Sequence, residues 1–265
     1  MTGRDRDSRM LRAAALFFVA LLSFGCAGLW EETGSGRLVE ETVVHTVGPG
    51  ETLASIADDY YGEPGAAEYL AHVNGVPAGL TLDPGTVIDV PVSSEDLERY
   101  RMRTEAKSHY NRGTALASAG ELARSEEAFR KALELDPRFA DAAYNLGVVL
   151  LARGESNRAV LLLEQTASVR PEDAGIRFAL GKALSECGRH AQATDEFRRA
   201  VRLDPSLEEA AYALGLSLLA ADRREEGIVA LDAYLRRFPE GQWAREARSR
   251  LARLARENDT GEGEH

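Results

Sequence analysis

The sequence predicts a mostly α-helical protein, in which a solenoid of stacked helix pairs follows a small domain with two strands. The first observation is a register of 34 residues that is repeated four times between Ala106 and Gly241. Self-similarity at a fixed period is typical of repeat architectures. The second observation is a pair of β-prone runs, 43–47 and 87–90, which flank two short helical stretches. We therefore expect a small βααβ domain followed by a helical array.

Each 34-residue unit has the pattern of two helices joined by a tight turn. Small residues mark the place where the two backbones cross, bulky residues fill the space beside it, and proline ends the second helix because it lacks a backbone donor. The columns are glycine at Gly113, Gly147, Gly181 and Gly215, turn residues at Gly120, Gly154, Gly188 and Asp222, small residues at Ser125, Ala159, Ala193 and Gly227, bulky residues at Phe129, Leu163, Phe197 and Leu231, and proline at Pro137, Pro171, Pro205 and Pro239. The predicted repeats are about 106–139, 140–173, 174–207 and 208–241.

These columns resemble the tetratricopeptide repeat (TPR). The resemblance implies a TPR-type α-solenoid over residues 93–241, with four helix-turn-helix repeats whose first helices line a concave face. Residues 242–256 read as one more amphipathic helix, with Trp243, Ala247, Leu251 and Leu254 on its apolar side. Such a helix caps the open end of a repeat stack. The polar, acidic segment 257–265 is predicted to be disordered.

The N-terminus has the pattern of a secretory signal. Arginines at positions 4, 6, 9 and 12 precede an apolar run over 13–25, which ends in small residues. This run is shorter than the roughly 20 apolar residues that a membrane-spanning helix needs. We therefore predict a cleaved signal peptide over 1–25.

The junction after the apolar run resembles a bacterial lipobox, in which Cys26 becomes the lipidated first residue. The match is imperfect, because Leu22 is displaced by one position, and Ser23 with Gly25 also satisfies ordinary signal cleavage. Since Ala27 follows the cysteine, the resemblance implies anchoring in the outer membrane, facing the periplasm. Residues 26–42 are rich in Glu and Gly and read as a flexible tether.

Residues 43–92 carry a second, unrelated pattern. The stretches HTVGPGETLASIA (45–57), YYG (60–62) and DPGTVIDVP (83–91), with Asn74 between the last two, resemble the LysM domain. That resemblance implies a strand-helix-helix-strand fold that binds N-acetylglucosamine chains such as those of peptidoglycan. The implied ligand groove lies between two loops, at Gly50, Glu51, Thr52, Leu53, Asn74, Gly75 and Val76.

A structural reading of these loop residues stays open. Thr52 is also a good N-cap for a helix, and Asn74 with Gly75 also fits a turn. The segment 43–92 contains seven carboxylates and no Lys or Arg. Because the stem peptides of peptidoglycan also carry carboxylates, we expect modest affinity that salt or mild acid improves.

One further column predicts a protein-binding groove on the array. Aromatic residues recur every 34 positions on the first helix of each unit, at Tyr110, Tyr144, Phe178 and Tyr212. Aromatic rings on the concave face would dock an extended peptide or a partner helix, with Asn111, Asn145 and Lys182 as polar contacts. The same column also fits rings that pack between neighbouring repeats, so both interpretations stay open.

Charge and motifs narrow the classes of function. The chain of 265 residues has 32 basic and 43 acidic side chains, which gives a net charge of −11 and argues against nucleic-acid binding. The histidines show no metal-ligand spacing, and no nucleophile elbow or phosphate loop is present. We expect no catalytic residue, no metal and no cofactor.

The sequence as a whole predicts a non-catalytic adaptor of the bacterial cell envelope. Its LysM-like domain would bind peptidoglycan, a lipid on Cys26 would hold it to the membrane, and the array would bind a protein that the sequence does not name. The alternative is a soluble periplasmic assembly or scaffold factor in which the LysM-like domain is only a spacer.

Overall fold

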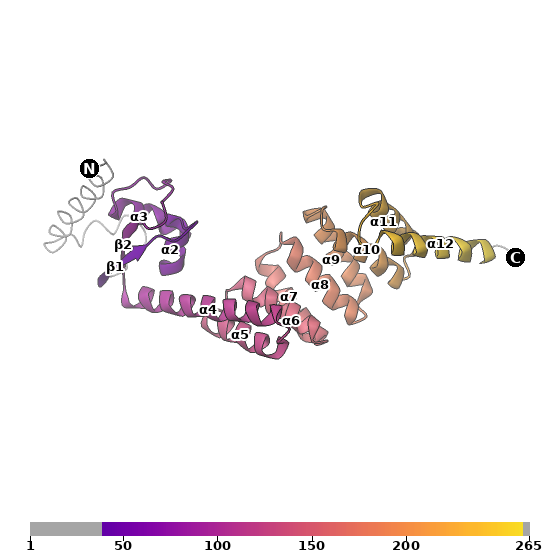
Figure 1. Ribbon diagram of the computed structural model, residues 1–265, viewed down its shortest axis with the longest axis horizontal. Helices are drawn as coiled ribbons and strands as arrows, with labels where there is room; N and C mark the ends of the chain where they lie inside the picture. Colours follow the sequence, from indigo (N-terminus) through magenta and orange to yellow (C-terminus); the bar gives the residue numbers. More distant parts are fainter. Residues whose placement is uncertain (1–38, 262–265) are drawn as a thin grey trace. The chain divides into compact units, whose positions relative to one another are not determined.

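The structure is a computed structural model that describes residues 39–261. The predicted signal peptide, Cys26 and most of the tether lie outside the described residues. The chain divides into two compact units, Met1–Glu105 and Ala106–His265, whose elements are labelled in Figure 1. Helix α4 (Ser94–Ser118) has residues in both units.

The first unit has the order strand, helix, helix, strand. Strand β1 (Glu41–Thr46) pairs antiparallel with β2 (Val87–Val92), with Val44 opposite Asp89. Between them lie α2 (Leu53–Tyr61), a short 3₁₀ turn at Pro64–Ala66, and α3 (Ala67–Val73). A two-stranded sheet is marginal in water by itself. The two helices and the start of α4 supply the remaining apolar surface.

The core of the first unit forms where one face of α2 meets the inner face of the sheet. Its large buried side chains include those of Leu53, Ile56, Tyr60, Leu70 and Val90, and Tyr100 of α4 packs against this cluster. The side chain of Tyr61 is also buried, and its hydroxyl donates a hydrogen bond to the carbonyl oxygen of Pro91, 2.7 Å away. The helices are thereby tied to the second strand as well as packed on it.

The second unit is a stack of antiparallel helix pairs (Figure 1). Helix α4 pairs with α5 in the first repeat, and each later repeat contributes two helices of 13 and 14 residues. After α4, the helices of the array are α5 (Leu122–Leu135), α6 (Ala140–Ala152), α7 (Ser156–Val169), α8 (Ala174–Glu186), α9 (His190–Leu203), α10 (Glu208–Ala220), α11 (Arg224–Arg237) and α12 (Ala244–Gly261).

The glycine column explains how tightly each pair is packed. A Cβ added to Gly113 would lie 2.7 Å from the ring of Phe129, and one added to Gly147 would lie 2.7 Å from Leu163. The same approach recurs at Gly181 and Gly215. Real Cβ atoms do not come this close to another heavy atom, so any larger residue at this column forces the two helices of its repeat apart.

The fourth repeat departs from the pattern at Tyr234, which occupies a column of small residues. The ring of Tyr234 is 1% exposed and lies 5.5 Å from that of Tyr212 and 5.6 Å from that of Phe238. Its hydroxyl donates to the carboxylate of Glu208 at 2.7 Å and accepts the backbone N–H of Trp243 at 3.1 Å. The large side chain therefore fixes the start of the last helix.

The last helix runs further than the sequence indicates. We expected a capping helix over 242–256 and disorder from residue 257, whereas α12 extends from Ala244 to Gly261. Arg224 of α11 contributes to this difference, since it donates to the carbonyl oxygen of Leu254 at 2.7 Å and pairs with Glu257 at 3.1 Å. None of the described helices combines the length and apolar character that crossing a bilayer requires.

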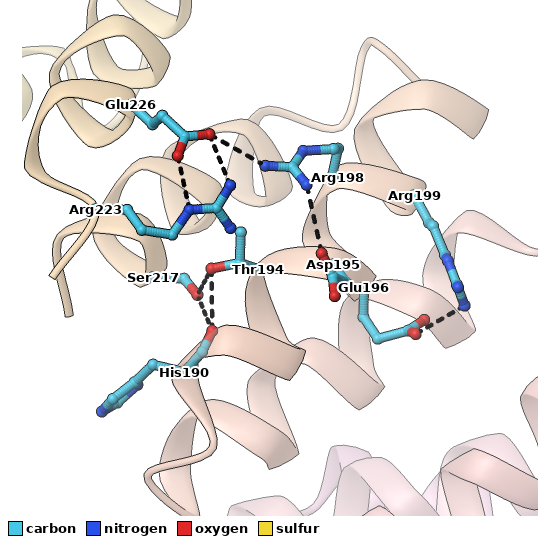
Figure 2. Close-up of polar contacts among 9 residues, drawn as sticks. All are labelled: His190, Thr194, Asp195, Glu196, Arg198, Arg199, Ser217, Arg223 and Glu226. Carbon is cyan, nitrogen blue, oxygen red and sulfur yellow. Dashed lines mark hydrogen bonds and ion pairs between the residues drawn. The ribbon is translucent and has the colours of Figure 1, made fainter. Parts of the chain in front are cut away.

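The third and fourth repeats meet through a buried polar contact (Figure 2). The hydroxyls of Thr194 and Ser217 are 2.7 Å apart, and each lies 3.0 Å from the backbone oxygen of His190. Each hydroxyl proton therefore has an acceptor, which removes the cost of burying an unpaired polar group. On α11, Glu226 accepts two hydrogen bonds from Arg223, both of 2.7 Å, and lies 3.8 Å from Arg198.

The equivalent position in the first repeat has a different chemistry. There Glu126 is 4% exposed, and its carboxylate pairs with Arg130 at 2.6 Å, with Arg158 at 2.8 Å, and with Arg153. These four residues lie on the wall of a cavity of about 530 Å³ that is otherwise lined by further charged groups and Ala123. The carboxylates and the basic groups that line this cavity are equal in number. We therefore interpret its lining as an ion-pair network that joins the first two repeats.

Candidate functional site

The loop after β1 and the loop before β2 meet at one end of the sheet. Strand β1 ends at Thr46, opposite Val87, where β2 begins. Beyond this pair, the backbone N–H of Val47 donates to Thr86 at 2.8 Å, and that of Gly85 donates back to Val47 at 2.7 Å. The loop after β1 and the loop before β2 are therefore joined by backbone hydrogen bonds.

The predicted glycan residues in these loops divide into exposed backbone and buried side chains. Gly50 and Gly75 have positive φ angles, 79° and 63°, and a Cβ on either would meet nothing within 4 Å. Leu53 is buried, and Val76 is half-buried against the core. The glycines thus leave peptide groups accessible, while the two apolar residues serve the core.

Glu51 directs its carboxylate into its own loop. The same carboxylate oxygen accepts the backbone N–H of Gly48 at 2.8 Å and lies 2.8 Å from Nε2 of His45. The other ring nitrogen of His45 lies 3.3 Å from the hydroxyl of Tyr60. Burial, followed by the hydrogen bond with Tyr100, raises the pKa of Tyr60, so its hydroxyl stays protonated.

Thr52 and Asn74 have structural contacts. Thr52 is the N-cap of α2, and it forms a reciprocal capping box with Ser55. The amide nitrogen of Asn74 donates to the carbonyl oxygens of Leu70 at 2.8 Å and Asp89 at 2.9 Å, and its amide oxygen accepts the N–H of Asp89 at 2.8 Å. Asn74 therefore ties α3 to the edge of β2, at the point where the second candidate loop begins.

The second unit contains a pocket at the C-terminal end of its array. Its volume is about 500 Å³, and its lining comes from α8, α9, α10 and the segment that begins α12. Three of the seven predicted groove residues line it, namely Phe178, Lys182 and Tyr212. The other lining residues are Ser185, Glu186, Phe197, Glu209, Ala213, Leu216, Ser217, Ala220, Trp243 and Arg250.

The walls of this pocket are aromatic. The rings of Tyr212 and Trp243 are stacked, with centroids 5.6 Å apart and planes 6° apart, and Phe178 packs against Phe197 at 5.8 Å. Tyr212 is 6% exposed, so most of its ring is committed to packing. Burial, with a smaller contribution from Glu246, raises the pKa of the Tyr212 hydroxyl.

Charged groups lie at the rim of the pocket. Lys182 places its ammonium 5.5 Å from the centroid of the Phe178 ring and 3.4 Å from the carboxylate of Glu209. Arg250 of α12 pairs with Glu246 at 3.0 Å. Aromatic walls with a few charged groups at the edge are typical of a surface that binds a segment with both apolar and polar groups.

The other four predicted groove residues do not line this pocket. Tyr110 packs against Phe139, with ring centroids 5.0 Å apart, and its hydroxyl accepts a hydrogen bond of 3.1 Å from the amide of Asn145. Tyr144 is half-buried, and burial raises the pKa of its hydroxyl. Asn111 is exposed. The aromatic column therefore packs between repeats at its N-terminal end and also reaches a pocket at its C-terminal end.

Sequence reasoning missed two contributors to the pocket wall. Trp243 was placed on the apolar face of the capping helix, and Arg250 was not singled out, yet both reach the pocket. Neither belongs to the 34-residue register, so no column of the repeat identifies them. Among the described residues, no group of three His, Cys, Asp or Glu side chains could hold a metal ion.

Comparison with known proteins supports the helical part of this description. Residues 97–184 match the middle TPR-like domain of cilia and flagella-associated protein 70, and residues 174–207 and 209–241 each match a tetratricopeptide repeat. No protein of curated function matches the sequence.

Solved structures show the same fold. One is YrrB, described as a TPR protein with an unusual peptide-binding site. It is 24% identical with a TM-score of 0.52, and the match covers 58% of this chain and 79% of that one. Another is a tetratricopeptide repeat protein from Parabacteroides merdae ATCC 43184, 18% identical with a TM-score of 0.52, over 59% of this chain and 62% of that one. The chain thus contains tetratricopeptide repeats in a mostly helical TPR-like solenoid, and such repeats indicate a protein–protein interaction scaffold.

Proposed function

We propose that this chain is a non-catalytic adaptor of the bacterial cell envelope, whose array holds a segment of a partner protein. The observation that carries the proposal is the aromatic pocket between α8, α10 and the start of α12. Its volume of about 500 Å³ falls within the range of ligand sites, roughly 300–1,000 Å³. TPR-repeat proteins are generally non-catalytic adaptors, which agrees with this reading.

The pocket would take one or two apolar side chains of the partner. An inserted side chain would contact the accessible faces of Phe178 and Trp243, while Lys182 and Glu209 at the rim would meet polar groups beside it. Burial of apolar area drives such binding, and the charged rim adds specificity. The array is nearly charge-balanced in sequence, so shape and local chemistry decide the partner.

Photo-crosslinking in cells tests this site directly. A photoreactive residue at position 182, where Lys182 is exposed on the pocket rim, should yield a cross-linked protein. The matched control is position 131, because Lys131 is an exposed lysine on the wall of the ion-pair cavity. Products at both positions, or at neither, would contradict a partner site in the aromatic pocket.

We also propose that the N-terminal unit binds glycan chains that contain N-acetylglucosamine, as the resemblance to LysM domains implies. The glycine backbone is exposed at Gly50, in the loop after β1, and at Gly75, in the loop that follows α3. Peptide N–H and carbonyl groups at such positions suit the acetamide groups of the sugar, because no side chain blocks close approach. Pull-down on purified sacculi tests the proposal, and the expected binding increases with salt.

Export and a lipid on Cys26 would bring the two activities together. An anchor in the outer membrane and weak attachment to peptidoglycan raise the local concentration of a partner that is held by the array. Fractionation checks the anchor: the native chain should enter the membrane fraction, and Cys26→Ala should move to the soluble pool. A mature N-terminus without acyl chains would overturn it.

One observation favours a second candidate, a soluble periplasmic scaffold in which the N-terminal unit is a spacer. The side chains of Glu51, Thr52 and Asn74 all make hydrogen bonds within the unit. If the N-terminal unit fails to bind sacculi at any salt concentration while the crosslink at position 182 persists, the spacer function is the correct one.

A further inference from the structure

The loop after β1 is a turn that is closed by two hydrogen bonds. The backbone N–H of Glu51 donates to the carbonyl oxygen of Gly48 at 3.3 Å, which is long for such a bond. In the opposite direction, the N–H of Gly48 donates to the carboxylate of Glu51 at 2.8 Å. The shorter bond has a charged acceptor, and hydrogen bonds to charged groups are the stronger kind. The carboxylate therefore closes this turn more firmly than the backbone does.

The same carboxylate is connected to the core. His45 presents Nε2 to it at 2.8 Å, and a carboxylate accepts only, so this nitrogen carries a proton. The imidazole is 12% exposed, and its other nitrogen faces the hydroxyl of Tyr60 at 3.3 Å. The ring of Tyr60 is in turn stacked on that of Tyr100, with centroids 3.9 Å apart. A continuous series of contacts thus leads from buried rings to the exposed turn.

The turn needs such support because its sequence is permissive. Gly48 and Gly50 flank Pro49, and Gly50 has a φ of 79° in open space. Glycine loses more conformational freedom on ordering than any other residue, so a turn with two glycines costs more to hold in one shape. Without the bond from Gly48 to Glu51, the peptide groups around Gly50 would sample several orientations.

We infer that Glu51 is a positioning residue: it holds residues 48–51 in the shape that presents the backbone of Gly50 to a glycan, and it does not contact the sugar. The inference rests on the proposed glycan binding by this unit. The family resemblance implies that Glu51 contacts the ligand, whereas this inference gives it the role of ordering the turn.

Three substitutions in the full chain test this role. Glu51→Ala removes both the bond to Gly48 and the pair with His45. Glu51→Gln keeps an oxygen that accepts the N–H of Gly48. Glu68→Ala is the matched control for charge, because Glu68 is an exposed carboxylate on α3 of the same unit. Each variant is titrated with soluble N-acetylglucosamine oligomers, and amide hydrogen exchange is measured at Gly48 in the absence of ligand.

We expect Glu51→Ala to bind about tenfold more weakly, since an ordered turn is lost before binding. Glu51→Gln and Glu68→Ala should stay within about threefold of the native chain. The amide of Gly48 should exchange slowly in the native chain and in Glu51→Gln, and fast in Glu51→Ala. This exchange, together with rescue by glutamine, distinguishes positioning from a general loss of stability.

Two results would overturn the inference while the native chain binds. Equal weakening by Glu51→Ala and Glu51→Gln, with slow exchange of Gly48 in Glu51→Gln, would show that the charge itself meets the ligand. Native affinity in Glu51→Ala would show that the turn needs no support. If the native chain does not bind the oligomers, the glycan proposal fails instead. In that case the amide exchange of Gly48 still tests whether Glu51 orders the turn. Fast exchange in the native chain would show that the turn is not ordered.

Discussion

The two candidate sites use their side chains in opposite ways. In the N-terminal unit, the polar side chains nearest the candidate loops are bonded inside the fold, as Asn74 is to the backbone of Asp89. In the array, Phe178 and Lys182 lie on the wall of an open pocket. A ligand of the first site would meet mainly backbone, whereas a ligand of the second would meet side chains. Substitutions should therefore change stability and binding together in the first unit and separately in the second.

Tyr212 should be an exception in the array, because its substitution should change stability and binding together. It also has the largest expected effect on the free energy of unfolding. Its ring is 6% exposed and stacked on Trp243, so Tyr212→Ala removes core packing as well as pocket wall. We expect a loss of about 3–5 kcal/mol in the free energy of unfolding of the array. Denaturant unfolding followed by the tryptophan signal measures it.

Tyr212→Phe is the control for that experiment, because it keeps the ring and removes only the hydroxyl. Phe178→Ala completes the series, since Phe178 is only half-buried and should cost less. If Tyr212→Ala leaves the stability unchanged, the ring of Tyr212 serves as a wall of the pocket and does not support the packing of the array.

The next largest effect should come from Asn74. Asn74→Ala removes three hydrogen bonds, two of which join the end of α3 to β2, and leaves the N–H of Asp89 without this acceptor. Bonds of this kind contribute about 0.5–1.5 kcal/mol each, and an unpaired group adds to the loss, so we expect about 2–4 kcal/mol. Hydrogen exchange across β1 and β2 reports it.

The matched control for Asn74 is Asn111→Ala, which removes an exposed asparagine from α4. It should leave exchange in the sheet unchanged. Sacculus binding provides the sharper comparison: a loss of binding with full protection of the sheet would make Asn74 a direct ligand contact and remove the contrast between the two sites.

The helical architecture could be predicted because its determinants are local. Gly113 meets Phe129 within one repeat, and the same contact recurs every 34 residues, so the sequence pattern and the packing have the same period. The pocket could not be predicted in the same way. Its fourth wall is Trp243, which reaches Tyr212 only after the chain has left the register. One column therefore has different roles at its two ends, because the neighbours beyond the array differ.

The polar side chains of the N-terminal unit show a second limit of sequence reasoning. The resemblance to a sugar-binding family predicted a ligand groove between two loops, and the structure shows that the loop after β1 is bonded to the loop before β2 through Val47 and Thr86. It also implied that Glu51 and Asn74 contact ligand. Their bonds depend on where the loops meet the strands, which residue spacing does not specify.

A pH experiment tests whether the hydroxyl of Tyr234, at the C-terminal end of the array, is shielded from water. Burial, followed by the hydrogen bond to Glu208, raises the pKa of Tyr234 from 10.0 to about 12. Well below pH 10 the hydroxyl is protonated in both states, so its contribution to stability is fully present. Between about pH 10 and 12 the unfolded chain releases this proton while the folded chain keeps it, so stability falls as pH rises.

Tyr234→Phe removes this group and should flatten that fall. Urea unfolding of both chains at a series of pH values from 9 to 11 gives the difference in slope. Parallel slopes would mean that the hydroxyl reaches water in the folded chain, which would place an opening between α11 and α12.

The smallest change in stability is expected for substitution of Lys182. This substitution should alter binding without altering stability, which is the clearest contrast with the N-terminal unit. Lys182 and Glu209 are each 44% exposed at a distance of 3.4 Å, and exposed pairs of this kind contribute about 0–1 kcal/mol. We therefore expect Lys182→Ala to unfold within about 0.5 kcal/mol of the native chain. Capture of the partner identified by crosslinking should nevertheless weaken, because the charge at the pocket rim is lost. Glu209→Gln breaks the same ion pair but keeps the lysine. If it weakens capture as much as Lys182→Ala does, the intact ion pair is what the partner recognises; if neither weakens capture, the aromatic walls alone select the partner.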